Sequence, residues 1–276
     1  MKSRFSFAAA SWFSCVALLA AAAFVAQAGA QDWAKALLDK SPRHQEWVKI
    51  GHDGRFVDAF VVYPEVSHKA PVVLLVHEIF GLSDWARSMA DDIAAMGYIV
   101  IAPDLLSRFG PNGGNTTAFA DQQAVMKAVS GLDPDIVTAD LHASADYALR
   151  LPAANGKLAV VGFCWGGGKS FLFATQRHKL NAAFVFYGPP PPVDSMKSIA
   201  APVYGFYGGN DARITATIPD TKSAMQAAGK NYDPVIYDGA GHGFMRAGED
   251  PANTIPANTT ARNEALKRLE TLLKGM

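Results

Sequence analysis

The chain has 276 residues, with 25 lysines and arginines against 25 aspartates and glutamates, and half of its residues are hydrophobic. This balance of charge argues against nucleic acid or an anionic membrane surface as the main partner. About 250 residues is a comfortable length for a single α/β domain.

The first 30 residues are predicted to be a signal peptide, domain 1–30. A short positively charged start precedes residues 5–26, which are almost wholly apolar or small, and residues 28–30 (AGA) have the small-x-small pattern read by signal peptidase. We therefore expect an exported protein, periplasmic or secreted, with a retained membrane anchor as the alternative. No later stretch approaches the ~20 apolar residues that span a bilayer, so we expect no membrane association after cleavage.

Apolar runs alternate with helix-like segments in the rest of the chain, which predicts an α/β fold with a mostly parallel sheet and helices on both faces. The runs VVLLVH, YIVIA and LAVVGF are apolar at successive positions, as in strands buried on both faces. We expect about seven or eight strands. The clearest candidates are residues 56–63, 71–77, 98–102, 157–162, 182–187, 202–207 and 234–237.

Three helices have clear sequence signals. Ser83 or Asp84 would cap a helix that ends near residue 96, and Asp133-Pro134 would open another that runs to about residue 150. The last helix, near residues 261–274, places four leucines on one stripe. No linker divides the chain, so residues 31–276 are expected to form a single domain.

The stretch GFCWGGGKS, residues 162–170, has two interpretations. A phosphate-binding loop requires G-x-x-x-x-G-K-[ST], and Gly168-Lys169-Ser170 matches only its end. Phe163 stands where the first glycine is needed, because Gly162 comes one residue too early. The nucleotide interpretation is therefore disfavoured.

The second interpretation is a nucleophile elbow, in which a strand turns sharply into a helix at the reactive residue. Gly162 and Gly166 stand two residues on either side of Cys164, as this turn requires. A helix N-terminus and a nearby imidazole both favour a thiolate, and the amide of Trp165 would donate to an oxyanion. Cys15 lies in the leader, so Cys164 has no disulfide partner. A small buried cysteine is the structural alternative.

An elbow predicts an acid and a histidine, each in a loop after a later strand. Asp211 follows the strand expected to end at residue 207, and His242 follows the one that ends at residue 237. His242 would take the thiol proton and later protonate the leaving group, while Asp211 would fix the tautomer of the imidazole. Asp194 and Asp238 are weaker candidates for the acid.

No metal or cofactor is expected. His77 could begin an H-E-x-x-H motif, but Gly81 stands where the second histidine would be needed. With one cysteine outside the leader and no paired histidines, the chain lacks a usual ligand set. The other histidines are scattered singly and are expected on the solvated surface: His44, His52, His68, His142 and His178.

Taken together, these motifs resemble the dienelactone hydrolase family. The resemblance is carried by the stretch EIFG at residues 78–81, the cysteine elbow, Asp211, and Gly241-His242 with Arg246 four residues on. It extends from about residue 47 to residue 273 and implies an α/β-hydrolase fold. It also implies hydrolysis of a lactone or ester through an acyl-enzyme on the cysteine.

The resemblance implies roles for three further residues. Glu78 would pair with the cysteine and assist its activation when substrate arrives, the amide of Ile79 would be the second oxyanion donor, and Arg246 would bind a substrate carboxylate. Family members that cleave dienelactone have a second carboxylate-binding arginine, whereas residues 112–138 contain none. A neutral or differently charged ester or lactone is therefore also expected among the substrates.

Three functions remain open at this point. The leading hypothesis is a cofactor-free, cysteine-dependent hydrolase, acting as a monomer on a small-molecule ester or lactone. The first alternative is a non-catalytic binding protein on the same fold, which the fold itself permits. The second alternative is an acyltransferase that passes the acyl group from Cys164 to an acceptor other than water.

Overall fold

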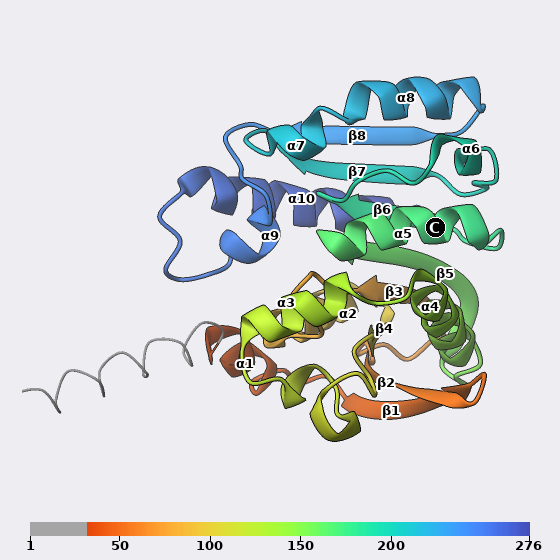
Figure 1. Cartoon of the computed structure of the whole chain (residues 1–276), viewed down its shortest axis with the longest axis vertical. Helices are drawn as coiled ribbons and strands as arrows, with labels where there is room; N and C mark the ends of the chain where they lie inside the picture. Colours follow the sequence, from red (N-terminus) through yellow and green to blue (C-terminus); the bar gives the residue numbers. More distant parts are fainter. Residues whose placement is uncertain (1–31) are drawn as a thin grey trace, which may run out of the picture.

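One eight-stranded sheet organises the protein, whose computed structural model describes residues 32–276. The predicted signal peptide lies outside the described residues. The strand order is β1-β2-β4-β3-β5-β6-β7-β8, and Figure 1 shows the sheet extending from β1 at the bottom to β8 at the top. The β1–β2 and β2–β4 pairs are antiparallel and all later pairs are parallel, which confirms the predicted mostly parallel sheet.

The elements alternate along the chain as the apolar runs predict. The strands are β1 (Gln45–His52), β2 (Arg55–Val62), β3 (Ala70–Val76), β4 (Ile99–Asp104), β5 (Ala154–Phe163), β6 (Ala182–Phe186), β7 (Val203–Gly208) and β8 (Tyr232–Tyr237). The helices are α1 (Asp32–Leu38), α2 (Asp84–Ala95), α3 (Gln122–Ser130), α4 (Pro134–Leu149), α5 (Trp165–Gln176), α6 (Val193–Met196), α7 (Ala212–Thr215), α8 (Ile218–Ala227), α9 (Phe244–Ala247) and α10 (Pro256–Lys274). Two short 3-10 turns, Pro111–Gly113 and Thr116–Ala118, follow β4.

The helix starts follow the capping signals in the sequence. The side chain of Ser83 accepts a hydrogen bond from the amide of Ala86 at the start of α2, and that of Asp133 accepts from the amide of Asp135 at the start of α4. Both predicted caps are confirmed. Helix α10 begins at Pro256, five residues earlier than expected, because proline is well suited to the first helical turn.

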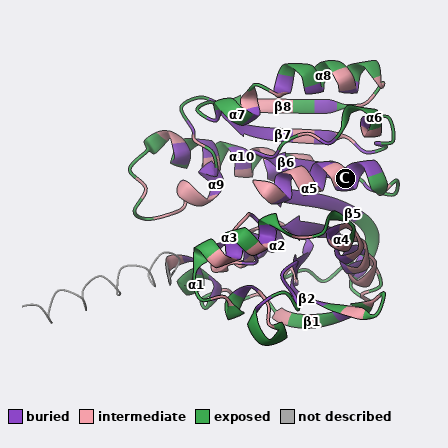
Figure 2. Cartoon of the chain, in the orientation of Figure 1, coloured by how far each residue is buried: buried purple, intermediate pink, exposed green. Residues whose placement is uncertain are grey.

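The sheet is buried on both faces. Along β3, Leu74 and Val76 belong to one buried cluster, to which α4, α5 and α8 contribute, while Val73 and Leu75 belong to the other, to which α1, α2 and α10 contribute. Figure 2 shows the contrast between these central strands and the more exposed β1 at the edge. This two-sided burial explains why the sequence of β3 is apolar at every position.

Strand β1 was not among the strands predicted from sequence. Ile50 is the only buried residue in its sequence, QEWVKIGH, and the polar residues in this stretch obscure the alternating pattern typical of a strand. It pairs with β2 through a tight turn at Asp53 and Gly54, whose φ angles are 45° and 75°. An Asp-Gly pair at positive φ is a strong hairpin signal, which could have located this strand.

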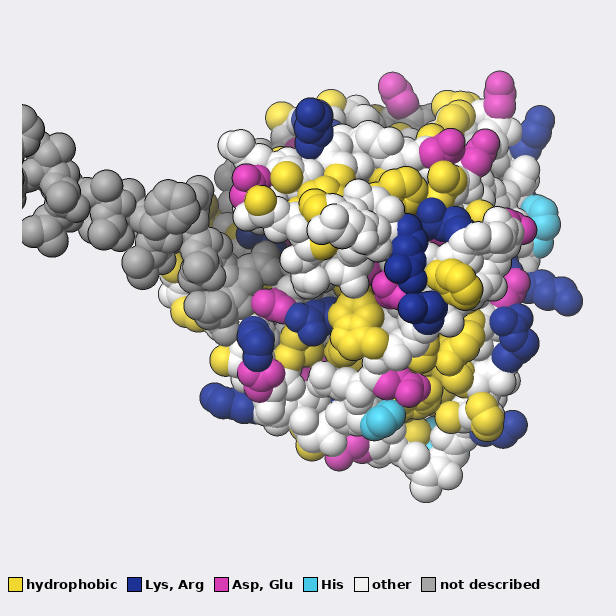
Figure 3. All heavy atoms as spheres, turned by 60° about the horizontal axis from the view of Figure 1, so that its bottom comes forward, with side chains coloured by type: hydrophobic (Ala, Val, Ile, Leu, Met, Phe, Trp, Pro, Cys, Tyr) yellow, Lys and Arg dark blue, Asp and Glu magenta, His cyan; other side chains and the backbone are white. Residues whose placement is uncertain are grey.

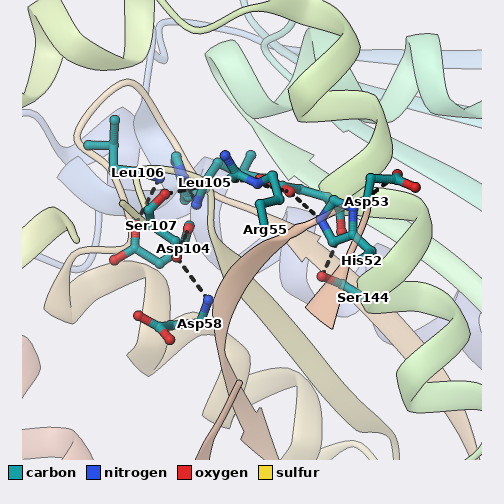
Figure 4. Close-up of polar contacts among 11 residues, drawn as sticks. His52, Asp53, Arg55, Asp58, Asp104, Leu105, Leu106, Ser107 and Ser144 are labelled. Atoms are coloured by element: carbon teal, nitrogen blue, oxygen red, sulfur yellow. Dashed lines mark hydrogen bonds and ion pairs between the residues drawn. The ribbon is translucent and has the colours of Figure 1, made fainter. Parts of the chain in front are cut away.

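The expectation that His52 is solvated was wrong. Its side chain is 11% exposed, and its Nε2 lies 2.6 Å from Oδ1 of Asp140 on α4. Arg55 also donates to this carboxylate, over 2.9 Å from Nε and 2.7 Å from Nη2. Figure 4 shows His52 and Arg55 side by side near Ser144. The cause is the burial of Asp140, because a buried carboxylate requires charged and hydrogen-bonding partners.

His142 also departs from the expected surface position. It is half-buried, and its ring lies 4.8 Å from the ring of Phe173, centroid to centroid. Elsewhere the surface is mixed in charge: on the face at the bottom of Figure 1, Lys and Arg side chains lie among Asp, Glu and hydrophobic ones (Figure 3). Within residues 32–276, no helix is both long enough and apolar enough to cross a membrane.

Candidate active site

Cys164 occupies a strained turn between β5 and α5. Its φ and ψ are 54° and −116°, a conformation that non-glycine residues rarely adopt. A Cβ on Gly162 would overlap the carbonyl oxygen of Gly166, and a Cβ on Gly166 would overlap that of His77. Both flanking positions therefore require glycine, and the turn holds the cysteine at the end of the strand.

The side chains of Cys164, His242 and Asp211 contact one another in series. Nε2 of His242 lies 3.1 Å from Sγ of Cys164, and Nδ1 lies 2.5 Å from Oδ2 of Asp211. The hydrogen bond with Cys164 is the main cause that raises the pKa of His242 to about 9, and the bond with Asp211 acts in the same direction, against the effect of burial. This arrangement favours a protonated imidazole at neutral pH, between the sulfur and the buried carboxylate.

Direct contacts hold the two loops that carry Asp211 and His242. The amide of Asn210 donates to the carbonyl oxygen of Ala240 over 2.9 Å, so one loop is bonded to the other. The amide of Gly241 donates to Oδ1 of Asn258 on α10, also over 2.9 Å, and that asparagine is buried. The position of His242 is therefore fixed by the fold and does not depend on its own side-chain contacts alone.

The two rival acids lie elsewhere. Asp194 is exposed on α6 and Asp238 is exposed in the loop after β8, whereas Asp211 is 7% exposed and contacts the imidazole. Of the three carboxylates considered from sequence, Asp211 is the one that the structure brings to His242.

Glu78 is buried and forms an ion pair with the partly exposed Arg246. Its Oε2 accepts a 3.0 Å hydrogen bond from Nε of the arginine, and its Oε1 accepts a 3.2 Å bond from the hydroxyl of Tyr187. Burial raises the pKa of the Glu78 carboxyl, and the charge of Arg246 opposes that shift. The resemblance implied a pairing of Glu78 with Cys164. In this structure its side chain is hydrogen-bonded to Arg246 and Tyr187.

Tyr187 was missed by the sequence analysis. It is fully buried, it has a φ of 40°, and its ring packs edge-on against that of His242 with 5.2 Å between centroids. Its hydroxyl binds Glu78, so one side chain touches two members of the site. The signal that could have located it is its place directly after β6, because functional side chains gather at the carboxyl ends of parallel strands.

The two expected oxyanion donors lie close to a buried histidine. The amide of Trp165 opens α5, and the first amides of a helix have no partner within the helix. The Trp165 ring stacks on His77 with 5.6 Å between centroids, and His77 precedes the loop that carries Ile79. Ile79 is half-buried and packs with Trp165 against the buried side chains of α3.

His77 is a structural residue. Its Nδ1 lies 2.7 Å from the carbonyl oxygen of Glu78 and must donate, so its Nε2 is free to accept from the amide of Leu105 at 3.4 Å. Burial lowers the pKa of this imidazole to about 4, which keeps it neutral at physiological pH. The ring thus joins the Glu78 loop to the segment after β4.

A buried aspartate supports the same loop from the other side. Asp104 accepts hydrogen bonds from the hydroxyl of Thr116 over 2.7 Å and from the amides of Thr116 and Leu106, each over 3.0 Å. Asp104 and Leu106 are among the residues drawn in Figure 4. The Thr116 hydroxyl in turn accepts from the amide of Leu82. Gly81 has a φ of 69°, and a Cβ there would crowd Thr116.

No metal site accompanies these residues in the described part of the chain: residues 32–276 contain no group of three or more His, Cys, Asp and Glu side chains able to hold a metal ion. The groups that the structure brings together here are a thiol, an imidazole, two carboxylates and backbone amides, with Arg246 as the neighbouring cation.

The chain is similar to known proteins of one family. The model of the dienelactone hydrolase family matches residues 57–276. A protein of Methylorubrum extorquens named "Putative carboxymethylenebutenolidase" is 35% identical over 209 residues, 71% of each chain. A protein of the same name from Escherichia coli is 36% identical over 212 residues, 72% of this chain and 76% of its own.

A solved structure extends the similarity to three dimensions. The crystal structure titled "Putative Dienelactone Hydrolase" from Klebsiella pneumoniae superposes with a TM-score of 0.70 at 29% identity, over 82% of this chain and 97% of its own. The predicted α/β-hydrolase fold is confirmed by this likeness and by the eight-stranded sheet. The chain is thus a hydrolase of the dienelactone hydrolase family.

Proposed function

We propose that the protein hydrolyses an ester or lactone through an acyl-enzyme on Cys164. The single observation that carries this proposal is the position of His242, whose two ring nitrogens contact Sγ of Cys164 and Oδ2 of Asp211. A nucleophile, a base and an orienting carboxylate in hydrogen-bond series are the parts that acyl transfer requires.

In the first half of the reaction, the thiolate of Cys164 attacks the substrate carbonyl and a C–S bond forms. The carbonyl oxygen gains the negative charge and is stabilised by the amides of Trp165 and Ile79. As the tetrahedral intermediate collapses, the C–O bond breaks, and His242 gives its proton to the departing alkoxide. For a lactone the alkoxide stays attached, so the ring opens on the enzyme.

In the second half, water replaces the alkoxide as the attacking group. Neutral His242 removes a proton from the water, hydroxide adds to the thioester, and the C–S bond breaks to release the acid and restore the thiolate. Asp211 accepts the hydrogen bond from Nδ1 throughout, which keeps Nε2 directed at the reacting atoms. Every step uses groups that belong to this chain, together with substrate and water.

Glu78 and Arg246 are proposed to act on the substrate side of the site. The two side chains form an ion pair in this structure, and a substrate carboxylate that bonded to Arg246 would compete with Glu78 for the guanidinium. Displaced from that ion pair, the Glu78 carboxylate could then assist the cysteine, as the family resemblance implies. Relatives are named for butenolide substrates, so unsaturated lactones with and without a carboxylate belong in the substrate panel.

The direct test is substitution of the nucleophile. Activated esters and lactones are assayed with the wild-type protein and with Cys164→Ala, and we expect turnover to fall by about 10³-fold or more because the covalent route is closed. Gly131→Ala, at the end of α3, serves as a control for handling, since a Cβ there makes ordinary contacts. Full turnover by Cys164→Ala would end the proposal.

We also propose that the protein acts after export, as a monomer. The apolar leader supports export, and its removal would leave residues 31–276. N-terminal sequencing of protein recovered from the periplasm or medium of a bacterial host tests the first point, and light scattering of the purified protein tests the second. Recovery of the uncleaved chain from the cytoplasm would contradict the export proposal.

A further inference from the structure

Lys169 is a half-buried cation close to the proposed nucleophile. It lies on α5, five residues after Cys164, and its Nζ is 5.1 Å from the centroid of the Trp165 ring. Helical side chains lean toward the N-terminus of their helix, and residues four apart lie on one face. The Lys169 side chain therefore extends over Trp165 toward the end of the helix where Cys164 is placed.

Lys169 differs from the partly buried arginines of this protein in having no carboxylate partner. Each partly buried arginine in residues 32–276 has a carboxylate oxygen within 4.0 Å, as Arg55 has Asp140 at 2.7 Å. Among the same described residues, no carboxylate oxygen lies within that distance of Lys169 Nζ. Burial lowers the pKa of its ammonium. A desolvated cation without a counterion is unfavourable, which makes the position receptive to an anion.

The surroundings of Lys169 connect it to the reacting centre. The Trp165 ring, over which the ammonium lies, also stacks on His77. Together with Ile79 and Phe119 it packs against the buried cluster of α3. The side chains of Ile79, Phe119 and Trp165 thus form a continuous, partly apolar surface that extends from the loop that carries Ile79 to the Lys169 ammonium. An acyl chain that lay along this surface would have its carbonyl at one end and a cation at the other.

Arg246, the other cation beside the site, is already engaged. Its Nε bonds to Glu78, and its guanidinium lies 4.8 Å from the centroid of the Phe80 ring. A substrate anion that bound Arg246 would have to compete with a buried carboxylate, whereas at Lys169 it would meet no such competitor. Binding of an anion is therefore more favourable at Lys169 than at Arg246 in this structure.

We propose that Lys169 is a specificity-determining residue that binds a carboxylate on the acyl portion of the substrate. The inference rests on the proposed function, because it takes Cys164 as the atom that attacks the carbonyl. Five residues of helix separate the two backbones by about 7.5 Å, and the lysine side chain leans back over Trp165 across part of that distance, so the carboxylate lies a few bonds from the reacting carbonyl. Half-esters of a diacid as long as glutarate match this distance better than oxalate half-esters.

The experiment compares anionic and neutral probes of similar reactivity. For turnover, mono-4-nitrophenyl glutarate is set against 4-nitrophenyl acetate. For the thiol alone, 6-maleimidohexanoate is set against N-ethylmaleimide, with the label mapped to Cys164. The variants are Lys169→Met, which keeps the chain length without the charge, and Lys169→Arg. Lys230→Met is the matched control, because Lys230 is also half-buried and without an ion pair but lies beyond α8.

We expect the anionic-to-neutral ratio of kcat/KM, and the same ratio of labelling rates, to fall about tenfold in Lys169→Met. Lys169→Arg should retain the ratio within a few-fold, and Lys230→Met should keep the wild-type ratio. Thermal unfolding is measured for every variant, and Lys169→Gln replaces the methionine variant if that one fails to fold. A wild-type ratio in folded Lys169→Met, or in the Lys169→Gln variant that replaces it, overturns the inference.

The two proposals fail in different ways. If the wild type hydrolyses both esters and Lys169→Met leaves the anionic-to-neutral ratio unaltered, the role of Lys169 is refuted and the proposed function is retained. If labelling of Cys164 by the anionic maleimide depends on Lys169 but neither ester is hydrolysed, the proposed function is refuted and the anion contact at Lys169 is retained. The maleimide pair therefore gives a result even if the protein turns over none of the esters.

Discussion

Glu78 and Arg246 are 168 residues apart in the chain, and Nε of the arginine donates a 3.0 Å hydrogen bond to the buried carboxylate of the glutamate. This contact joins the loop after β3 to α9, directly beside the loop that carries His242. Tyr187 adds a second donor to the same carboxylate. The ion pair is therefore part of the architecture of the site as well as a candidate for its chemistry.

The first prediction concerns the stability of this ion pair. Arg246→Met leaves the buried Glu78 without its cation, which is unfavourable, and because Arg246 is partly exposed the free energy of unfolding should fall by about 2–3 kcal/mol, less than for a fully buried pair. The double variant Glu78→Gln/Arg246→Met should recover most of this loss, because no unpaired charge remains. Urea denaturation measures all three proteins. A single variant as stable as the wild type would contradict the prediction.

A second prediction follows from the protonation of His242. Its pKa is raised to about 9, so kcat/KM should be level near neutral pH and decline as the pH rises through about 9, where the proton for the leaving group is lost. In Asp211→Asn the hydrogen bond that stabilises the imidazolium is weakened. The decline should move to lower pH, and kcat should fall by about 10³-fold.

The exposed acid provides the control for this pH profile. Asp238→Asn changes an exposed carboxylate in the same loop as His242, after β8, and it should keep the wild-type profile because the carboxylate bonded to His242 is that of Asp211. The raised pKa of His242 also has a consequence for folding. Because the folded-state pKa of His242 is above the usual 6.5, its contribution to stability is fully present below pH 6.5 and is lost as the pH rises through about 9. An identical pH profile for Asp211→Asn and the wild type would be evidence against the role of Asp211.

The third prediction concerns acid stability and His77. Its folded-state pKa is lowered to about 4 from 6.5, so between these values the unfolded chain binds a proton that the folded chain does not. Stability therefore falls as the pH drops from 6.5 to 4, by about 3 kcal/mol from this residue. His77→Gln removes this titration. As the pH falls from 6.5 to 4, the free energy of unfolding of the variant should therefore rise relative to that of the wild type by a similar amount.

The measurement must separate His77 from a neighbour that titrates with the opposite sign. Burial raises the pKa of Asp104 to about 6, so the folded state binds the extra proton between that value and 3.8, and this group gains stability on acidification. The comparison of His77→Gln with the wild type cancels that contribution, since Asp104 is present in both. A difference in unfolding free energy that is constant from pH 7 to pH 4 would refute the assignment.

The fourth prediction addresses the geometry of the elbow. A Cβ on Gly162 would overlap the carbonyl oxygen of Gly166, and a backbone atom cannot rotate away as a side chain can. Gly162→Ala should therefore lower the free energy of unfolding by about 3 kcal/mol or more and displace Cys164. Gly131→Ala, where the nearest atom is 3.5 Å from the new Cβ, should change stability by less than about 1 kcal/mol. Equal stability of the two variants would contradict this account of the turn.

The sheet and the elbow could be predicted because their causes are local. Strand β3 is apolar at every position, and Gly162 and Gly166 are required within five residues of chain by the turn itself. The order nucleophile, acid, histidine then located Asp211 and His242, because each loop follows its own strand. Local pattern and topology together were sufficient for these residues.

The residues that escaped prediction depend on contacts between distant segments. His52 is largely buried because it contacts the buried Asp140, 88 residues later in the chain, and no local sequence pattern predicts that contact. Tyr187 binds Glu78 from 109 residues away, and the pairing of Glu78 with Arg246 spans more still. Such partners become visible only when the strands are placed side by side.

The most direct test of the central claim is capture of the acyl-enzyme. The wild-type protein is mixed with 4-nitrophenyl acetate, quenched with acid within one turnover, digested and mapped by mass spectrometry. We predict an acetyl group on the peptide that contains Cys164, formed at least as fast as steady-state turnover and absent from Cys164→Ala. Rapid hydrolysis with no acyl group on Cys164, or with the group on another residue, would contradict the account.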